Sequence, residues 1–230
     1  MSGKALFEYP IRAAVWLCEL VGKLYFRIGF RPQLTFTGKD VSSLHFREPS
    51  ILIANHTSTN DPILLLSLIT HKRSIVVAKD WFEKKQFHWI LSREKCIPCD
   101  RYNLDTEWAL LAKKQLEAGN SVIIFPEGKC REDGLLNEFK SGFAFLARST
   151  GAPVIPVGID GVYKLGHRTR LVVGDAEKIS RVKGISSSAH LAERSEYFRQ
   201  KVWKLKLLAK NVPFRELPPA ESTPPEEVKI

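Results

Sequence analysis

The sequence predicts an α/β fold with a largely parallel sheet flanked by helices. From residue 51 onward, short runs rich in β-branched residues alternate with longer helical stretches, and this alternation is typical of parallel sheets. The chain has 230 residues and is 44% hydrophobic, which is enough for one sizeable core. We therefore expect one main domain over 36–212, with short appendages at 1–35 and 213–230.

The N-terminal segment, residues 5–30, predicts an amphipathic helix. Its charged residues recur at spacings of seven, four and four, which places them on one narrow stripe, and the rest of the helix surface is apolar and aromatic. Such a helix can anchor a protein in a membrane interface. The inserted side chains would be Trp16, Tyr25 and Phe26, with Lys23 and Arg27 at anionic headgroups. The same pattern also fits a helix packed on the sheet, and the segment alone leaves both interpretations open.

No membrane span or secretory signal is expected. No stretch reaches the ~18–20 uncharged apolar residues that cross a bilayer. Glu8, Pro10 and Arg12 interrupt the region where the apolar core of a signal would begin. These observations predict a protein that stays in the cytosol.

Strands and helices are expected to alternate along the main domain. Each expected strand is a short run dominated by apolar, mostly β-branched residues, and helical stretches lie between the strands. Gly119 and Gly151 are placed as C-terminal stops of helices. The expected strands are 51–54, 74–78, 121–125, 154–159 and 170–173, and the expected helices are 62–70, 82–92, 104–118, 139–150 and 189–210.

The last expected helix combines an apolar stripe with an excess of cations. Its stripe consists of Leu191, Phe198, Val202, Leu205 and Leu208. We expect this helix to cover the sheet and to expose a basic face to solvent, with a second membrane contact as the alternative. The tail that follows, residues 213–230, is rich in Pro and Glu and is expected to be disordered.

The chain is basic, with 35 Lys and Arg residues against 25 Asp and Glu residues and a net charge of +10. This charge favours anionic lipid surfaces, phosphorylated substrates or polyanions, and it does not choose among them. A nucleic-acid-binding module would fit the charge alone. Because the sequence contains no recognised nucleic-acid motif, no nucleic-acid partner is expected.

Four cysteines in a chain of this length are too few for a disulfide scaffold, which indicates a reducing compartment. Cys96 and Cys99 form the one closely spaced pair. Such a pair can be redox-active or half of a zinc site, but no second pair and no matching histidines follow it. A metal site is therefore not expected.

Two polar segments follow expected strands and could carry chemistry. The first contains His56 and Asp61, at the carboxyl edge of the sheet where open α/β sheets bind ligands. Histidine titrates near neutrality and can accept a proton from a hydroxyl, while a carboxylate orients the ring. His56 is thus a candidate general base and Asp61 its orienting partner. An ordinary loop histidine and a helix N-cap at Asp61 would also explain the pattern.

The second segment is Phe125-Pro126-Glu127-Gly128-Lys129-Cys130-Arg131. Glycine lets a backbone approach a ligand closely, and cations beside a carboxylate can hold a phosphate and orient a hydroxyl. Arg101, just ahead of an expected helix, and Lys140, shortly before Gly142, add two weaker candidates. Solvated surface positions would explain each of these cations alone.

Four blocks in order resemble the lysophospholipid acyltransferase family, typified by 1-acyl-glycerol-3-phosphate acyltransferases. They are the His56–Asp61 block, Asp100-Arg101, Phe125-Pro126-Glu127-Gly128 and Val154-Ile155-Pro156-Val157, and the resemblance covers about residues 45–175. It implies transfer of a fatty acyl group from acyl-CoA or acyl carrier protein to the hydroxyl of lysophosphatidic acid, giving phosphatidic acid. His56 would match the general base and Asp61 its partner. No cofactor and no enzyme nucleophile are implied, because the hydroxyl attacks a thioester that is already activated.

The resemblance also places the acceptor's phosphate near Arg101 and the Glu127-Gly128 block. Here the chain departs from the family, in which Thr usually follows Phe-Pro-Glu-Gly and Arg comes soon after. Lys129 could bind the phosphate as a flexible point charge and Arg131 could hold it bidentately, with Lys140 as a third choice. Other lysophospholipids or a lyso-aminolipid are alternative acceptors, and a membrane-bound scaffold without catalysis is an alternative function.

An enzyme with a lipid acceptor and a lipid product also gives the basic N-terminal helix a use. Apolar insertion and attraction to anionic headgroups would together hold the protein peripherally on the cytoplasmic face of the cell membrane. The expected partners are therefore the lysophospholipid acceptor, the acyl-CoA or acyl carrier protein donor, and an anionic membrane surface.

Overall fold

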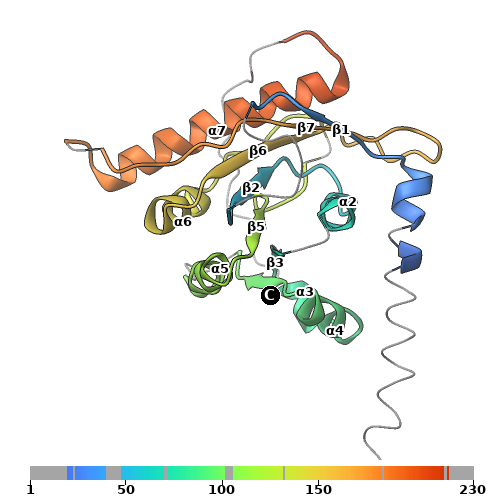
Figure 1. Cartoon of the computed structure of the whole chain (residues 1–230), viewed down its shortest axis with the longest axis horizontal. Coiled ribbons are helices and arrows are strands. Elements are labelled where there is room, and N and C mark those ends of the chain that lie inside the picture. Colours follow the sequence, from blue (N-terminus) through green and yellow to red (C-terminus); the bar gives the residue numbers. More distant parts are fainter. Residues whose placement is uncertain are drawn as a thin grey trace, which may run out of the picture.

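A computed structural model of the chain shows a central sheet with helices on both faces (Figure 1). The sheet has seven strands in the order β1-β7-β6-β2-β5-β3-β4. Its described neighbouring strands are all parallel except β6 and β7, which are antiparallel. The predicted α/β fold with a largely parallel sheet is therefore confirmed. The structure describes residues 20–22, 24–39, 48–69, 72–101, 106–131, 133–182, 184–214 and 217.

The strands are β1 (Gln33–Phe36), β2 (Ile51–Ala54), β3 (Arg73–Ala78), β4 (Ile97–Cys99), β5 (Ser121–Ile124), β6 (Val154–Ile159) and β7 (Arg170–Val173). The helices are α2 (Asn60–Leu68), α3 (Asp80–Glu83), α4 (Lys85–Arg93), α5 (Glu107–Glu117), α6 (Gly142–Thr150) and α7 (Ser187–Lys210). The described parts of residues 20–29 form a further helical segment ahead of β1.

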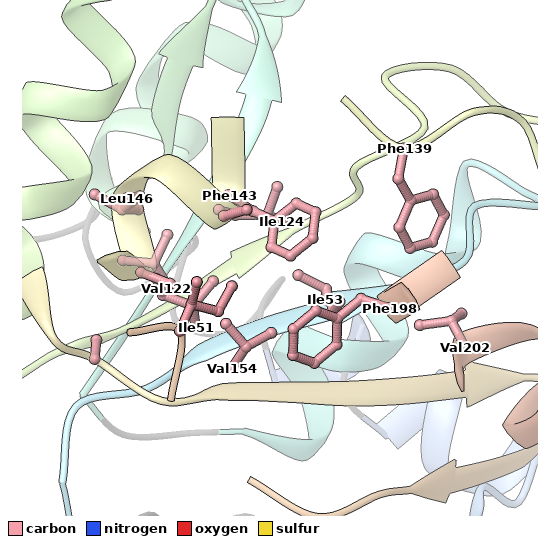
Figure 2. Close-up of a cluster of buried hydrophobic side chains, with 14 of the residues drawn as sticks. Ile51, Ile53, Val122, Ile124, Phe139, Phe143, Leu146, Val154, Phe198 and Val202 are labelled. Atoms are coloured by element: carbon pink, nitrogen blue, oxygen red, sulfur yellow. The ribbon is translucent and has the colours of Figure 1, made fainter. Parts of the chain in front are cut away.

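The central strands are buried on both faces, as parallel sheets covered by helices are. In β2, Ile51 and Ile53 belong to the apolar cluster that includes side chains of α5, α6 and α7, whereas Leu52 and Ala54 belong to the cluster that includes α2. Figure 2 shows the first cluster, in which side chains of α6 and α7 pack over the strands. Two-sided burial explains why these strands are continuous apolar runs in the sequence.

Helix α7 lies directly on β6 because Gly158 leaves room for its backbone. A Cβ atom at Gly158 would lie 2.3 Å from backbone atoms of both Leu205 and Lys206. The expectation that this helix covers the sheet is therefore confirmed, with two corrections. Leu208 is 50% exposed and does not share the buried stripe. Arg199 and Lys206, expected on a solvated basic face, are buried.

The five expected strands are present, and the expected helices correspond to α2 through α7 with shifted bounds. The helix expected over 82–92 is divided at Lys84, whose extended backbone, with ψ of 106°, separates α3 from α4. Two short strands were not expected, β1 and β4. β4 contains Pro98 and lies at one edge of the sheet, where a missing N–H is tolerated, and β1 is a partly exposed four-residue strand at the other edge.

The N-terminal helix packs on the sheet with one side and presents apolar side chains on the other. Trp16 and Lys23 lie outside the described residues. Phe26 is buried in the core beside Phe30, which corrects the expectation that it inserts into a membrane. The exposed apolar side chains of this helix are Leu20, Val21, Leu24, Tyr25 and Ile28.

Within the described residues, no helix has both the length and the apolar character needed to cross a bilayer. At the other end of the chain, Leu217 is buried against the core cluster of α5, α6 and α7. The rest of the tail expected to be disordered, beyond residue 214, lies outside the described residues.

Candidate active site

The two polar segments meet at the carboxyl edge of the sheet. β2 and β5 are neighbours in the sheet, so the loops that follow them lie side by side. The Arg131 N–H donates to the carbonyl oxygen of His56 over 2.9 Å, which joins the loops directly. The structure thus brings together residues that are about 70 positions apart in the sequence.

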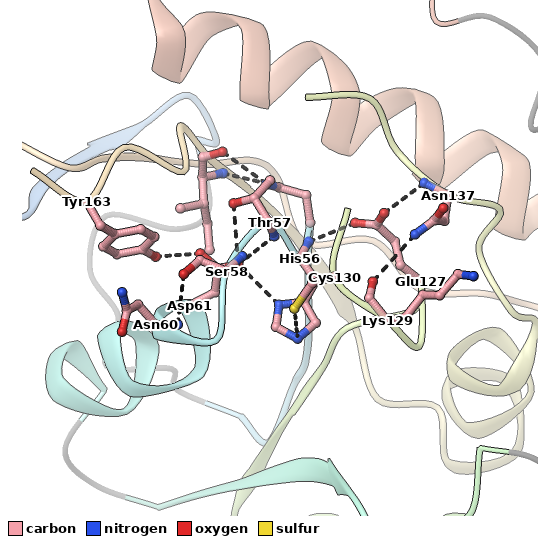
Figure 3. Close-up of polar contacts among 12 residues, drawn as sticks. His56, Thr57, Ser58, Asn60, Asp61, Glu127, Lys129, Cys130, Asn137 and Tyr163 are labelled. Carbon is pink, nitrogen blue, oxygen red and sulfur yellow. Dashed lines mark hydrogen bonds and ion pairs between the residues drawn. The ribbon is translucent and has the colours of Figure 1, made fainter. Parts of the chain in front are cut away.

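Asp61 is fully buried and holds the first loop in place. Its Oδ2 accepts the N–H groups of Thr57 and Ser58 over 2.7 and 2.8 Å, and its Oδ1 accepts the hydroxyl of Tyr163 (Figure 3). These donors compensate for the burial of the carboxylate. Asp61 is not a helix N-cap, because it lies within the first turn of α2 and reaches back to the preceding loop.

The His56 ring lies between Asp61 and Cys130. Its Nδ1 is 3.1 Å from Oδ2 of Asp61, and its Nε2 is 3.2 Å from Sγ of Cys130 (Figure 3). The ring stacks on Phe125, with centroids 4.4 Å apart, so its orientation is fixed on a third side. Burial lowers the pKa of His56, but the hydrogen bonds to Asp61 and Cys130 outweigh it and raise the pKa to about 9. Such a ring can take up a proton at Nε2 and hold it.

Glu127 is buried and supports both loops. Its Oε1 accepts the N–H of His56 and its Oε2 accepts the N–H of Asn137, each over 2.7 Å. Burial raises the pKa of this carboxyl group in spite of these hydrogen bonds. Both oxygens of Glu127 are thus engaged with backbone groups, and its geometry is that of a residue that positions the base.

Two buried cations of α7 bind the backbone of residues 134–137, the segment that also binds Glu127. Lys206 Nζ donates to the carbonyl oxygen of Gly134 over 2.9 Å, and Arg199 Nε donates to that of Asn137 over 3.0 Å. Burial lowers the pKa of Lys206 to about 8. The backbone of Asn137 is therefore held at its carbonyl by Arg199 and at its N–H by Glu127. Helix α7 thus contributes to the positioning of the active-site loops.

The site opens into a cavity of about 1320 Å³, and His56 and Cys130 are among its lining residues. This volume exceeds what a small polar metabolite requires and suits a long, flexible ligand. Much of the remaining wall is apolar and comes from α2, β3 and α4. These lining residues include Leu66, Ile75, Val77, Phe87, Ile90 and Leu91.

Three of the expected phosphate-binding cations line the same cavity: Arg101, Lys129 and Lys140. Arg101 is paired with Asp80, with 2.6 Å between Nη2 and Oδ2. Lys140 Nζ donates to the carbonyl oxygen of Arg101 over 3.4 Å, which places these two residues next to each other. Gly128 also lines the cavity; its φ is +72°, and an added Cβ would lie 3.4 Å from Lys140 Nζ.

Arg131 is placed differently. Its guanidinium binds the Asp133 carboxylate, with Nε 2.8 Å from Oδ1 and Nη2 2.7 Å from Oδ2, and Arg131 is not among the described residues that line the cavity. Its backbone N–H is the donor to the carbonyl oxygen of His56 described above.

The closely spaced cysteines form no disulfide. Cys96 and Cys99 are free thiols at β4, and burial raises the pKa of Cys96 to about 12. Cys96 is therefore a protonated core thiol at neutral pH. Among the described residues, no three His, Cys, Asp or Glu side chains are grouped as metal ligands.

Sequence reasoning does not single out Cys130, Tyr163 or Lys206 as site residues. Cys130 lies in the second segment between Lys129 and Arg131, and this pattern indicates a phosphate-binding segment rather than a role for the thiol. Tyr163 follows β6 and is 102 residues from Asp61, so no local pattern connects the two. Lys206 is one of many cations on α7, and only the close approach of that helix to β6 shows that its side chain is buried.

Comparison with known proteins identifies similar chains. A family model described as Acyltransferase matches residues 33–160, more than half of the chain. The chloroplastic 1-acyl-sn-glycerol-3-phosphate acyltransferase of Brassica napus is 30% identical over 119 residues, which cover 51% of this chain and 34% of that protein. The protein of that name from Pseudomonas aeruginosa is 26% identical over 149 residues, which cover 64% of this chain and 53% of that protein.

A solved structure has the same fold. The crystal structure of PlsC, the 1-acyl-sn-glycerophosphate acyltransferase of Thermotoga maritima, aligns with a TM-score of 0.59 at 21% identity and covers 86% of this chain and 80% of that chain. At this identity the likeness shows the fold alone. The chain spans about a third to a half of the length of the curated relatives that it matches.

Proposed function

The chain belongs to the acyltransferase family, and from this membership we propose that it transfers a fatty acyl group from a thioester donor to the free hydroxyl of a lysophospholipid. The acceptor we propose is 1-acyl-glycerol-3-phosphate, the substrate in the names of its relatives, and the product is phosphatidic acid. The donor is a thioester of coenzyme A or of acyl carrier protein. The observation that carries the proposal is that His56, paired with the buried Asp61, lines a large, mainly apolar cavity.

In this function, His56 acts as the general base. Asp61 engages Nδ1, so the proton of the acceptor hydroxyl is accepted at Nε2, on the side of the ring where Cys130 lies. The hydroxyl oxygen then attacks the thioester carbonyl, and the thiol leaves with the proton that His56 returns. Glu127 and Tyr163 position this pair without touching the substrate, through the His56 backbone and the Asp61 carboxylate.

The acceptor phosphate is proposed to bind at Arg101, Lys129 and Lys140. All three line the cavity that contains His56, and a phosphate held among cations gains charge-assisted hydrogen bonds. Arg131 takes no part in this proposal, because it is not among the described residues that line the cavity. The apolar wall from α2, β3 and α4 is proposed to receive the acyl chain, since burying each CH₂ group yields about 0.8 kcal/mol.

We further propose that the protein binds peripherally to the cytoplasmic face of the cell membrane. The N-terminal helix exposes Val21, Tyr25 and Ile28 at 57, 55 and 67%, and Leu165 lies beside them at 79%. An apolar patch of this kind on a basic protein suits an anionic lipid surface. This location would bring the cavity close to its lipid acceptor.

The test is an acyl-transfer assay with purified protein, labelled acyl-CoA and a panel of lysophospholipids, read by thin-layer chromatography of the products. We expect labelled phosphatidic acid from lysophosphatidic acid, and less product from acceptors with other headgroups. A parallel series with acyl carrier protein thioesters compares the donors. If no lysophospholipid is acylated with either donor, the proposed function is wrong, and if another headgroup is preferred, the acceptor is wrong.

A further inference from the structure

An exposed tryptophan and a lysine lie together at the cavity, and the function proposed above uses neither of them. Trp81, in the short helix α3, is 36% exposed and lines the cavity. Lys84 Nζ lies over the Trp81 ring, 4.3 Å from its centroid, and Lys84 lines the same cavity. Phe87 of α4 packs against the indole in a T-shaped arrangement, with ring centroids 5.2 Å apart. The Trp81–Lys84 pair is therefore part of the cavity lining and is supported by a third side chain.

The Trp81–Lys84 pair has the composition of a site for a phosphorylated aromatic group. An indole ring offers a platform on which a planar nucleobase can stack. A lysine ammonium binds a phosphate as a point charge. Among the described residues Lys84 has no ion pair with a carboxylate, so its ammonium can take up an anion without first losing such a partner. The neighbouring carboxylate of Asp80 is paired with Arg101.

We propose that Trp81 and Lys84 bind the nucleotide end of an acyl-CoA donor, with the adenine stacked on Trp81 and the ribose 3′-phosphate at Lys84. In coenzyme A this phosphate is carried by the same ribose as the adenine, so a stacking ring and a cation in contact with that ring match both groups at once. The inference rests on the proposed function, because it specifies the donor of that reaction. Acyl carrier protein presents its thioester on a phosphopantetheine arm without an adenine nucleotide.

The position of the pair relative to His56 suits the length of coenzyme A. Only β5 separates β2 from β3 in the sheet, so the carboxyl ends of β2 and β3 are about 10 Å apart. His56 comes shortly after β2, and Trp81 comes shortly after β3. The pantetheine arm that joins the thioester sulfur to the nucleotide is longer than this gap when it is extended. A thioester carbonyl beside His56 can therefore leave the nucleotide at the Trp81–Lys84 pair.

The cations of the cavity also provide for a second anion. Arg101, Lys129 and Lys140 are proposed above to bind the single phosphate of the acceptor. Lys84 is a further cation in the lining, and it lies between α3 and α4, whereas the other three come from the connections after β4 and β5. Coenzyme A carries several phosphate groups, so a donor of this kind needs cations in addition to those of the acceptor site.

A membrane contact is the competing use of an exposed Trp–Lys pair, and the chain offers a matched control for it. Trp89 of α4 is 42% exposed, and the guanidinium carbon of Arg93 lies 5.8 Å from the centroid of its ring. Trp89 is not among the described residues that line the cavity. Loss of Trp89 can therefore affect binding to a surface but should not affect binding of a nucleotide in the cavity.

Donors that differ only in their nucleotide test the inference. We would compare palmitoyl-CoA, palmitoyl-dephospho-CoA, which lacks the 3′-phosphate, and palmitoyl-pantetheine, which lacks the nucleotide, in acyl transfer to lysophosphatidic acid. Trp81→Ala should raise KM for palmitoyl-CoA about tenfold and leave KM for palmitoyl-pantetheine unchanged, because only the first donor has a base to stack. Lys84→Met should raise KM for palmitoyl-CoA about fivefold and leave KM for the dephospho donor unchanged. Trp81→Phe keeps an aromatic ring and should restore most of the affinity.

Binding of the nucleotide can also be measured without turnover. We would titrate adenosine 3′,5′-bisphosphate, the nucleotide end of coenzyme A, into the full-length chain by isothermal titration calorimetry. We expect it to bind the wild type and Trp89→Ala equally, and to bind Trp81→Ala about tenfold more weakly. In the transfer assay it should compete with palmitoyl-CoA and not with lysophosphatidic acid. Circular dichroism of each variant checks that the fold is kept.

The outcomes separate this inference from the proposed function. If folded Trp81→Ala raises KM for palmitoyl-CoA and palmitoyl-pantetheine equally, or changes neither, the pair binds no nucleotide and the inference is wrong, while acyl transfer stands. A higher kcat/KM with acyl carrier protein than with acyl-CoA would also contradict it. If Trp81→Ala weakens sedimentation with anionic vesicles and leaves bisphosphate binding intact, the pair is a membrane contact. If the bisphosphate binds through Trp81 and Lys84 but no lysophospholipid is acylated, the nucleotide site is supported and the proposed function is wrong.

Discussion

The loops after β2 and β5 differ from the exposed surfaces of α4 and the N-terminal helix in how their side chains are held. In the loops, Asp61 and Glu127 are 0 and 4% exposed, and all four of their carboxylate oxygens accept hydrogen bonds. On α4 and the N-terminal helix, Trp89 is 42% exposed and Ile28 67%. Precise geometry is thus built from buried, fully paired polar groups, while the contacts proposed for a lipid involve exposed apolar side chains and cations.

The sharpest test of this contrast is removal of the base. We expect His56→Ala to lower kcat by about 100-fold or more and Asp61→Asn to lower it substantially, because a neutral amide no longer stabilises the imidazolium. Initial rates at saturating substrates measure the effect. The control is His88→Ala, because this histidine of α4 hydrogen-bonds a carbonyl of α3 and its loss should change kcat little. A folded His56→Ala protein with more than about a tenth of wild-type kcat would contradict the assignment.

Glu127→Gln tests whether the loops depend on complete pairing. The amide offers one acceptor oxygen where two backbone N–H groups need one each, so one of them is left buried and unpaired. We expect a loss of about 1–3 kcal/mol in the free energy of unfolding, measured by urea titration, and a lower kcat. Glu94→Gln, which removes the charge that faces Arg73 at the end of α4, is the matched control and should leave kcat closer to wild type. Equal effects of the two substitutions on kcat would contradict the proposal that the loops after β2 and β5 depend on complete pairing more than α4 does.

The buried pair also predicts a pH-dependent stability. The pKa of His56 is about 9 in the folded state against an ordinary 6.5, so the folded protein binds this proton more tightly than the unfolded chain does. The resulting stabilisation is fully present below pH 6.5 and is lost as pH rises through 9, by an amount on the order of 1–3 kcal/mol. Urea unfolding of wild type and His56→Gln at pH 6 and 9.5 should show a difference that shrinks at the higher pH. A difference that stays constant would show that the folded protein does not bind this proton more tightly than the unfolded chain does.

Cations of the cavity wall should affect binding rather than the chemical step. Lys129→Met and Lys140→Met should each raise KM for the lysophospholipid about tenfold, because each removes a charge-assisted contact worth about 1.4 kcal/mol, with little change in KM for the acyl donor. Lys204→Met, on the exposed side of α7, is the control for loss of charge. Arg131→Met shows whether Arg131 contributes to binding of the lysophospholipid as Lys129 and Lys140 are expected to. If it raised KM for the lysophospholipid more than Lys140→Met did, the phosphate would bind on the Arg131 side.

The smallest effect is expected at the membrane. Ile28→Asp should weaken binding to anionic vesicles about threefold or more, because burying an aspartate in the interface opposes insertion, and sedimentation with liposomes measures it. Binding of the wild type should also weaken in high salt. Phe145→Asp places the same charge on an exposed apolar position of α6. The proposed membrane face would be wrong if both substitutions had the same effect. Deletion of residues 1–30 is a poor test, since it removes Phe26 and Phe30 from the core.

Much of the fold could be predicted from the sequence, because buried parallel strands and amphipathic helices leave strong local patterns. The strands β1 and β4 could not be predicted, because β1 is partly exposed and β4 contains Pro98. The His56–Asp61 pair could be predicted because its two residues are only five positions apart in the sequence. The burial of Arg199 and Lys206 could not be predicted, because it depends on which face of α7 meets the sheet.

Choosing among the cations also required the fold. Lys129 and Arg131 are two positions apart, and their residue types do not show that Arg131 pairs with Asp133 while Lys129 lines the cavity. The contact between His56 and Cys130 joins positions 74 apart. Pairings of this kind are set by the order of the strands in the sheet, which the sequence pattern leaves undetermined.

The close approach of α7 to β6 at Gly158 has a consequence for biosynthesis. The carbonyl groups of residues 134–137 bind Lys206 and Arg199, so the loop that carries Glu127 acquires its full set of partners only when α7 has docked. α7 ends at residue 210, late in the chain, and a ribosome has therefore translated both active-site loops well before the helix that secures them. A nascent chain arrested before this helix emerges would carry His56, Asp61 and Cys130 without the support that fixes their geometry.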